Sequence, residues 1–344
     1  MRAIGKILLV LTALLIFLFG LEILKGSAKG VMPLMAALRM QGVLNTTGLG
    51  WIMAYCVLSG SPVAAVALAL FGAGTIDSQE TLGMIAGSRF GGSFIVLFLG
   101  AINYFRRKRD ITAVGTGVLC LLVTWSVLLP SIVIGYTLLV TGLVDGATLP
   151  TPPILISLFD MVYGPAVRFL LEAIHPVILF VAGVVILIGS FGLFDRALPQ
   201  IDPESSRFRS IADVVYRPKV MFALGVAITL ITLSVSVSLG LLVPLSAKGY
   251  VRRENIVPYI MGANISTFVD TLLVAILVGV PHAFTVVLAL VLGVTLFSLV
   301  ILAGFYRSYR DGIEWCLERI TRSRYSFIVF VLVITAVPVV LMLM

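Results

Sequence analysis

The chain has 344 residues, of which 12% are charged and 60% are hydrophobic. Soluble domains have about 25% charged residues, so this composition excludes a soluble enzyme, a disordered protein and a nucleic-acid-binding module. The formal net charge of +8 does not point to nucleic acid either, because excess Lys and Arg usually marks the cytoplasmic loops of a membrane protein.

The first apolar run covers residues 4–24, and its charged residues are Lys6 and Glu22. No small-residue cleavage site follows this run, so we expect a retained membrane helix rather than a signal peptide. Arg2 and Lys6 lie at its start and favour a cytoplasmic N-terminus.

Seven further stretches contain at most one charged residue each, and a spanning helix needs about 20 apolar residues. Several are too long for one straight helix and too short for two. Gly, Pro and Ser interrupt them, which is tolerated inside a membrane only where the backbone is buried in protein or lines a cavity. We therefore predict an all-α polytopic protein of the plasma membrane, with eight to ten membrane segments, some of them broken or re-entrant. The stretches are residues 40–76, 81–105, 111–144, 173–194, 220–247, 256–306 and 326–344.

An internal repeat is the second organising feature of the sequence. Residues 59–93 align without gaps on residues 234–268, at an offset of 175, with six identical positions. Each copy has a serine-rich break, an apolar stretch, a glycine turn, a polar loop and a second break with small polar residues. We therefore divide the chain into a first membrane repeat, a connecting helix with an amphipathic linker, a second membrane repeat, and a basic loop with a C-terminal membrane helix. These four parts cover residues 1–110, 111–172, 173–305 and 306–344.

The polar loops of the two copies differ in charge. The first loop carries Asp77 and Glu80 and no Lys or Arg, whereas the second carries Arg252 and Arg253 against Glu254. Because basic loops tend to be cytoplasmic, we expect these two loops on opposite sides of the membrane. Equivalent loops on opposite sides make an inverted-topology repeat, an architecture that places a binding site between the halves, near the middle of the bilayer.

The two serine-rich breaks are the first candidate binding elements. In the first copy, glycine and proline lie beside two hydroxyl groups and can release backbone groups from helical pairing. In the second copy, three serines alternate with valines, and they would all face one way in an extended segment. These patterns predict two unwound segments that line a shared cavity. The alternative is that the serines bond to their own helix backbone or hold neighbouring helices together. The residues are Ser59, Gly60 and Ser61 in the first break and Ser234, Ser236 and Ser238 in the second.

The second break of each copy also carries polar side chains. Ser88 in the first copy, and Asn264 and Thr267 in the second, offer oxygen atoms that suit a weakly bound monovalent cation. Arg89 lies inside an apolar stretch, where a charged residue is costly and points to function. Its planar guanidinium suits an oxyanion such as phosphate.

Structural roles for the charged residues of these stretches are the competing interpretation. Arg89 could extend to the membrane surface, or it could pair with a carboxylate such as Asp160 or Asp270. For Asp270 three roles stay open, because it could ligate a cation, relay a proton or neutralise Arg89.

The sequence predicts neither a catalytic site nor a metal site. Cys56, Cys120 and Cys316 are far apart and do not have the spacing of metal ligands. A membrane lipid-phosphate phosphatase is one hypothesis, since the segment Gly87-Ser88-Arg89 is similar to a phosphate-handling loop. No His lies near that segment, so a partner for a nucleophile or a general acid is missing. We therefore expect that the protein is not an enzyme.

At these residues the chain resembles the type II sodium-dependent phosphate cotransporters, including their bacterial members. That family has two inverted repeats, each with a Gln-Ser-Ser-Ser motif and, at a fixed distance after the Gln, a Gly-Ser/Ala-Asn-Ile-Gly-Thr-type motif. Here Leu58 to Gly87 and Leu233 to Gly262 are both 29 residues apart. Residues 16–20 also resemble the first helix of the family.

The resemblance implies that the serine-rich segments bind phosphate and sodium. This chain departs from the family pattern at both motif glutamines, which are Leu58 and Leu233, and at the first motif asparagine, which is Arg89. Together with the candidates named above, the resemblance gives a substrate-binding set and an ion-binding set. The substrate-binding set is Ser59, Gly60, Ser61, Ser234, Ser236 and Arg89, and the ion-binding set is Ser88, Ser238, Asn264, Thr267 and Asp270.

We therefore predict a secondary active transporter that moves inorganic phosphate or a related small anion together with sodium, by alternating access. The alternative is a relative that keeps the fold without sodium coupling, such as a uniporter, a channel or an assembly partner. We expect no prosthetic cofactor. The expected partners are the small anion, sodium and the lipid bilayer, without nucleic acid, and a homo-oligomer is left open.

Overall fold

The computed structural model describes residues 3–37, 41–106, 111–149, 151–197, 217–247, 251 and 253–344. Throughout these residues the chain forms helices joined by short connections, and no strand is present. The prediction of an all-α fold is confirmed for this part of the chain.

The described N-terminal part of the chain contains eight helical segments. These segments are α1 (Ala3–Ser27), a 3-10 turn (Ala28–Val31), α2 (Met32–Ala37), α3 (Val43–Val57), α4 (Ser61–Gly72), α5 (Ser78–Gly92), α6 (Phe94–Arg106) and α7 (Ile111–Val140). The first serine-rich break lies between α3 and α4.

The rest of the chain begins with α8 (Pro153–Ala173) and α9 (Pro176–Ala197), which contact α1, and then continues through the helices of the second repeat copy. The helices after α9 are α11 (Pro218–Thr232), α12 (Val235–Gly240), α13 (Leu242–Ala247), α14 (Arg253–Ser266), α15 (Val269–Leu277), α16 (Pro281–Val300), a π-helical turn (Ile301–Phe305), α17 (Tyr306–Thr321) and α18 (Arg324–Leu343).

Seven segments of the described residues are long and apolar enough to cross a membrane. This number is below the eight to ten expected, because three apolar helices, α3, α4 and α11, have only 12 to 15 residues, and a span needs about 20. The helices are those of a multi-pass membrane protein. The seven segments are Gly5–Ala37, Ser78–Ile102, Val114–Val140, Pro176–Ala197, Glu254–Leu277, His282–Thr321 and Arg324–Leu343.

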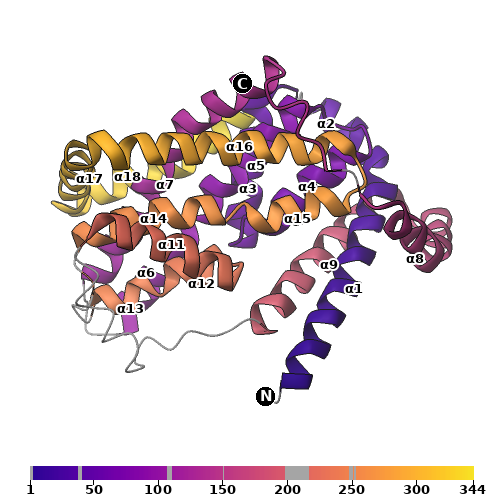
Figure 1. Cartoon of the computed structure of the whole chain (residues 1–344), viewed down its shortest axis with the longest axis horizontal. Helices are drawn as coiled ribbons and strands as arrows, with labels where there is room; N and C mark the ends of the chain where they lie inside the picture. The colour runs from indigo at the N-terminus through magenta and orange to yellow at the C-terminus, as the bar shows by residue number, and fades with distance from the viewer. Residues whose placement is uncertain are drawn as a thin grey trace.

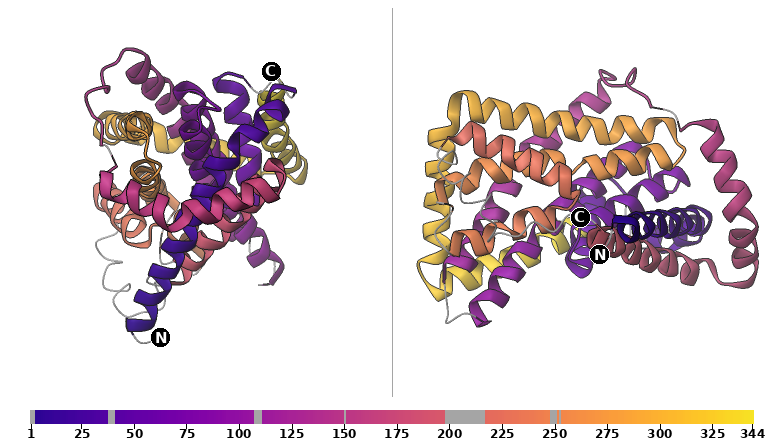
Figure 2. Two further views of the ribbon diagram at one scale, coloured as in Figure 1. Left: turned by 90° about the vertical axis from the view of Figure 1, so that its right-hand side faces the viewer. Right: turned by 60° about the horizontal axis from the view of Figure 1, so that its bottom comes forward.

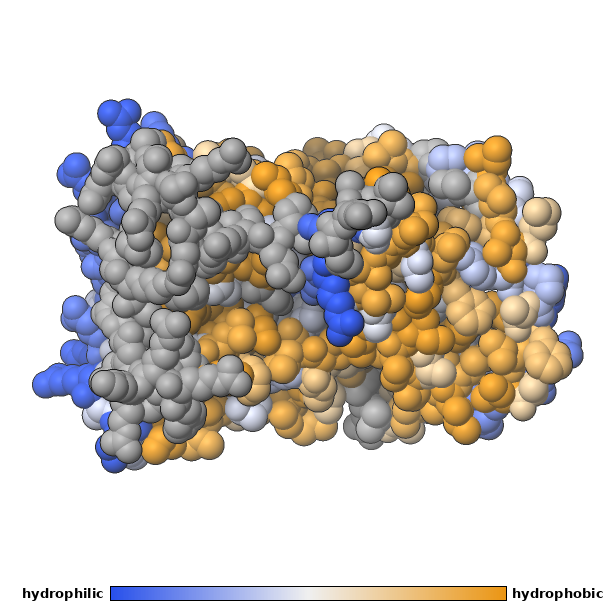
Figure 3. Space-filling view, turned by 90° about the horizontal axis from the view of Figure 1, so that it is seen from below, coloured by the Kyte–Doolittle hydropathy of each residue, from blue (hydrophilic) through white to orange (hydrophobic). Residues whose placement is uncertain are grey.

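Many large apolar side chains are exposed on the surface of the molecule. Leu8 on α1, Leu129 on α7 and Leu332 on α18 are each more than half exposed, which in water would be an unfavourable arrangement for so many large apolar side chains. Figure 3 shows an apolar surface across the middle of the molecule and hydrophilic residues gathered at its left end, the end at which Figure 1 places α17. Lipid contact accounts for this distribution.

The long helices lie roughly alongside one another, and two helices lie at their ends. In Figure 1, α14 and α15 follow each other nearly in line beside α16, while α1 and α9 lie side by side. α8 and α17 lie at opposite ends of the molecule, across the direction of the long helices (Figure 2). The segment that the sequence predicted to be a basic loop is therefore the helix α17. It buries Ile313 and Leu317 and exposes Trp315 to 58%.

Helix pairs α3–α5 and α11–α14 pack through equivalent glycines. A Cβ atom on Gly50 would overlap the carbonyl oxygen of Met84, and a Cβ atom on Gly225 would overlap that of Tyr259. Both glycines and both carbonyls are separated by 175 residues, the offset of the sequence repeat. The two pairs therefore share one packing mode, in which the absence of a side chain lets two helix backbones approach closely.

Both repeat copies break at the same positions. Leu58 follows α3 with φ 54°, and Leu233 follows α11 with φ 45°, so each helix ends in a left-handed residue. Farther along, α5 and α6 meet at Ser93, and α14 and α15 are separated by Thr267 and Phe268. The serine-rich breaks are present as predicted, whereas the second break of each copy is shorter than predicted, because residues 87–92 and 262–266 still belong to α5 and α14.

One detail of the second break differs from the prediction. The alternating serines of residues 234–238 were expected to lie in an extended segment, but Val235–Gly240 is the helix α12. The interruption is confined to Leu233 and Ser234, because the Ser234 side chain accepts a hydrogen bond from the Val237 amide and caps the new helix. Ser234 and Ser238 therefore have different surroundings.

Candidate functional site

Both serine-rich breaks border one cavity, which lies between segments far apart in the sequence. The cavity leaves about 30 Å³ for the centre of a water-sized molecule, which is room for roughly two waters or one similarly small group. Helices α5, α7, α9 and α14 contribute the other walls. Its lining includes residues 59–61 and 233–235 together with Arg89, Thr124, Asp195, Asn264 and Thr267.

Glycine makes the first break fit against α5. A Cβ atom on Gly60 would lie 2.6 Å from the Ser88 carbonyl oxygen, and one on Gly92 would lie 2.9 Å from the Gly60 nitrogen. These are shorter than van der Waals contacts, so the break and α5 can approach only without these side chains. α4 then begins at Ser61 with Pro62 in its first turn, where a missing amide hydrogen does no harm.

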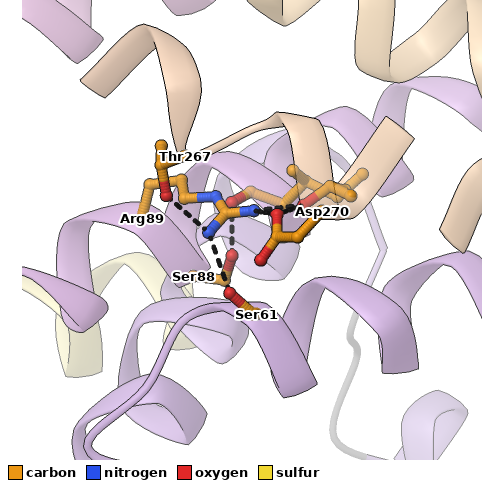
Figure 4. A network of polar contacts seen from close by, with 7 residues as sticks. Ser61, Ser88, Arg89, Thr267 and Asp270 are labelled. Atoms are coloured by element: carbon orange, nitrogen blue, oxygen red, sulfur yellow. Dashed lines mark hydrogen bonds and ion pairs between the residues drawn. The ribbon is translucent and has the colours of Figure 1, made fainter. Parts of the chain in front are cut away.

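Arg89 is the charged residue at the centre of this cavity region. It projects from α5, is 6% exposed, and reaches residues of the second repeat copy. One terminal nitrogen, Nη1, donates to Thr267 Oγ1 at 3.0 Å. The other, Nη2, donates to Asp270 Oδ1 at 3.2 Å and to Thr271 Oγ1. Figure 4 shows this network.

The guanidinium of Arg89 also faces the first break and an aromatic ring. Nη1 lies 3.5 Å from Ser61 Oγ, at the outer limit of a hydrogen bond. The central carbon lies 5.0 Å from the centre of the Phe268 ring, a cation–π distance. A buried cation is held here by one carboxylate, hydroxyl groups and a ring, which together compensate for its loss of hydration.

Three polar atoms near the cavity lack a hydrogen-bond partner among the described residues: Arg89 Nε, Asn264 Nδ2 and Asp270 Oδ2. Two of them are donors on residues that line the cavity. Asn264 is 3% exposed, and its Oδ1 accepts from Thr124 Oγ1 at 3.3 Å. Buried donors without acceptors are costly, so the cavity is suited to a ligand that supplies acceptor oxygens.

Seven of the residues singled out from the sequence meet at this cavity. The structure thus brings together Ser59, Gly60, Ser61, Ser234, Arg89, Asn264 and Thr267. Of the alternatives considered for Arg89, pairing with Asp270 is the one present, and Asp160 is an exposed residue of α8. Of the three roles considered for Asp270, the structure contains the neutralisation of Arg89.

Two of the expected ion-binding serines lie outside the cavity lining. Ser88 Oγ donates to the Ile85 carbonyl of its own helix at 2.6 Å. Ser238 Oγ is hydrogen-bonded to Thr229 at 2.6 Å and to Tyr259 at 2.9 Å, which ties α11, α12 and α14 together. The hydroxyl groups of these two residues therefore bond within their own helix or hold neighbouring helices together. The side chain of Ser236 lies outside the described part of the chain.

A second, apolar cavity adjoins the polar one. It has a volume of about 180 Å³ and lies between α1, α9 and α15. Phe191, Asp195 and Leu233 line both cavities, so the last turn of α9 is their common wall. Asp270 lines the apolar cavity and is not among the residues that line the polar one.

Asp195 is the residue of this region that the sequence analysis did not single out. It follows directly after the apolar stretch of residues 173–194, so the sequence alone places it outside the predicted helix. In the structure it belongs to α9, one turn after Phe191, and it lines the polar cavity together with Ser234. A carboxylate within the last turn of a membrane helix was the available signal.

Among the described residues, no group of three or more His, Cys, Asp or Glu side chains could hold a metal ion. No family model, no curated protein and no solved structure matches the chain. The function is therefore inferred from the geometry and charge of the cavity.

Proposed function

We propose that the protein is a secondary transporter that moves a small oxyanion, with inorganic phosphate as the first candidate, across the plasma membrane by alternating access. The observation that carries this proposal is the convergence of two interrupted helix segments on one polar cavity with a buried guanidinium. Such interruptions of the backbone inside a membrane are characteristic of substrate sites in transporters.

The internal repeat supports alternating access. Helix boundaries, left-handed residues and glycine contacts recur at an offset of 175 residues. In the sequence, residues 75–80 carry Asp77 and Glu80 and no Lys or Arg, whereas residues 250–255 carry Arg252 and Arg253 against Glu254. This charge difference supports an inverted arrangement of the repeats, in which one half can rock against the other around the cavity.

The chemistry of the cavity supports an anion rather than a cation as substrate. Arg89 Nε and Asn264 Nδ2 are donors that await acceptors, and the hydroxyl groups of Ser61 and Thr267 can donate as well. Asp270 already neutralises part of the guanidinium charge at 3.2 Å. An oxyanion would therefore bind at Nε of Arg89, which has no hydrogen-bond partner within the described chain. Before the oxyanion arrives, Asp270 already compensates the buried charge of the guanidinium.

Sodium remains the expected coupling ion on the basis of the family resemblance, and Asn264 and Thr267 supply oxygen atoms for it at the cavity. One observation favours the alternative of a relative without sodium coupling. The positions of the two motif glutamines are Leu58 and Leu233, and Leu233 presents an aliphatic side chain at the cavity, which offers no ligand to a cation.

The test is uptake of radiolabelled phosphate into proteoliposomes, measured with an inward gradient of sodium or of potassium. We expect uptake that Arg89→Asn lowers at least about 100-fold, whereas Arg168→Asn on the peripheral helix α8 leaves it unchanged. Equal uptake in both gradients would favour the uncoupled alternative. Uptake that does not depend on Arg89 would contradict the proposed site.

A further inference from the structure

Asp195 brings a carboxylate to the wall of the polar cavity that also contains the guanidinium of Arg89. Ser234, whose Oγ accepts from the Val237 amide at 3.3 Å, lines the same cavity. Because an ionised carboxylate has about four acceptor positions, Asp195 can accept hydrogen bonds from a ligand in the cavity.

The helix that carries Asp195 is held in place by close packing. A Cβ atom on Gly20 of α1 would lie 2.9 Å from Ile186 Cγ2, and one on Gly183 of α9 would lie 3.0 Å from Leu24. Phe191, one turn before Asp195, lines the same cavity. Close packing against α1 therefore fixes the middle of α9, and Asp195 lines the cavity as an exposed residue of the last turn of this helix.

The charges around the cavity disfavour an oxyanion that has only acceptor atoms. Among the described residues, one guanidinium and two carboxylates lie there, and Asp270 already occupies Nη2 of Arg89. A fully deprotonated oxyanion would face Asp195 with like charge and without a hydrogen bond. An oxyanion that also carries an O–H or N–H group could bind Arg89 with its oxygens and donate to Asp195.

We propose, on the basis of the transport function proposed above, that Asp195 is the specificity-determining residue of this cavity. It selects oxyanions that carry a hydrogen-bond donor and rejects those that carry none. Protonated phosphate meets this requirement through its hydroxyl group, and an aminoalkyl phosphonate meets it through its ammonium group. Sulfate, which has four acceptor oxygens and no proton at neutral pH, does not.

The experiment measures competition for binding of radiolabelled phosphate to the purified full-length protein. The competitors are unlabelled phosphate, sulfate and aminomethylphosphonate. In the wild-type protein we expect sulfate to compete at least about 100-fold more weakly than phosphate, because a carboxylate that faces an anion without a hydrogen-bond donor between them penalises binding. Asp195→Asn, whose amide can donate to sulfate, should bring the two anions within about 10-fold of each other.

Two further variants separate the carboxylate from other effects of substitution. Asp195→Glu keeps the carboxylate and should keep the preference for phosphate. Asp160→Asn removes a carboxylate from the exposed face of α8 and should leave all three affinities unchanged. Stronger competition by aminomethylphosphonate than by phosphate would support the inference and identify the donor as an ammonium group.

Equal competition by sulfate and phosphate in the wild-type protein would overturn the inference, and this result requires no variant to fold. An unchanged preference in Asp195→Asn would overturn it too. If phosphate binding depends on Arg89 but sulfate competes equally well, the role of Asp195 is contradicted and the proposed function is not. The absence of Arg89-dependent binding of any of the three anions would contradict the proposed function as well.

Discussion

Leu58 and Leu233 have φ angles of 54° and 45°, are the two non-glycine residues with positive φ in the described chain, and lie 175 positions apart. The left-handed conformation costs a residue with a side chain about 1–2 kcal/mol. Its occurrence at the same place in both repeat copies indicates that packing around the cavity imposes it. The turn brings the following serine of each copy to the cavity wall.

Branching at the Cβ atom should make this strain measurable at Leu233. Leu233→Ile places a β-branched side chain at positive φ, which is unfavourable, and should lower the stability by about 1–2 kcal/mol. Leu230→Ile, a matched change at an exposed position inside α11, should change it by less than about 0.5 kcal/mol. Thermal unfolding in detergent measures both, and equal effects would argue against a strained turn.

The glycine contacts should be sensitive to a single methyl group. Gly225→Ala places a Cβ atom against the Tyr259 carbonyl, so α11 and α14 must separate, and we expect a loss of about 1–3 kcal/mol or more. Gly50→Ala should act equally on α3 and α5. Gly189→Ala on α9, where no atom lies within 4 Å, should instead be neutral or stabilise by up to about 1 kcal/mol. Thermal midpoints of the three variants provide the comparison.

The ion pair of Arg89 and Asp270 should show strong coupling. Arg89→Ala leaves the Asp270 carboxylate buried without its cation and should cost about 3–5 kcal/mol. Removing both charges, in Arg89→Ala with Asp270→Ala, should cost less than the sum of the single changes. A double-mutant cycle of unfolding free energies measures this coupling. Additive effects would mean that the pair contributes little in the membrane protein.

Loss of the hydroxyl groups at the two breaks should affect transport and spare the fold. Ser61→Ala with Ser234→Ala removes two groups that line the cavity, and we expect phosphate uptake to fall at least about 10-fold, since each lost hydrogen bond is worth about 1 kcal/mol. Ser190→Ala, which removes a hydroxyl bonded to the Leu187 carbonyl of its own helix, is the control. Normal uptake by the double variant would show that the breaks do not bind substrate.

The inverted arrangement of the repeats predicts opposite accessibility of two loop positions. A cysteine at Ser78, beside the acidic loop, should react with a membrane-impermeant maleimide added outside intact cells. A cysteine at the exposed residue Glu254, beside the basic loop, should react only after the membrane is opened, because basic loops tend to be cytoplasmic. Labelling of both positions from the same side would rule out inverted repeats.

The all-α membrane fold and the positions of the helix interruptions could be inferred from the sequence, because both depend on local composition. Long uncharged runs predict membrane helices, and Gly60 with its neighbouring serines predicts an interruption. The exact extent of the second break was harder to infer. The alternating serines fit an extended segment, but Ser234 caps a helix at once, and whether a serine caps or lines a cavity depends on what packs beside it.

Long-range partners could not be inferred, because they depend on tertiary packing. The pairing of Arg89 with Asp270 joins residues 181 positions apart, and Asp160 was an equally plausible partner in the sequence. Asp195 was assigned to a loop since it ends an apolar run, yet α9 extends past it and carries it to the cavity. Similarly, α17 is hydrophilic enough to be taken for a loop until Ile313 and Leu317 are seen buried on one face.

The ionic link between Arg89 and Asp270 breaks the symmetry of the two repeat copies. Their counterparts at an offset of 175 are Asn264 and Ile95, which cannot form a second link of this kind. In a cycle in which the copies exchange conformations, the link would stabilise one orientation of the carrier and not its mirror image. Under the proposed function, the resting population would then face predominantly one side of the membrane.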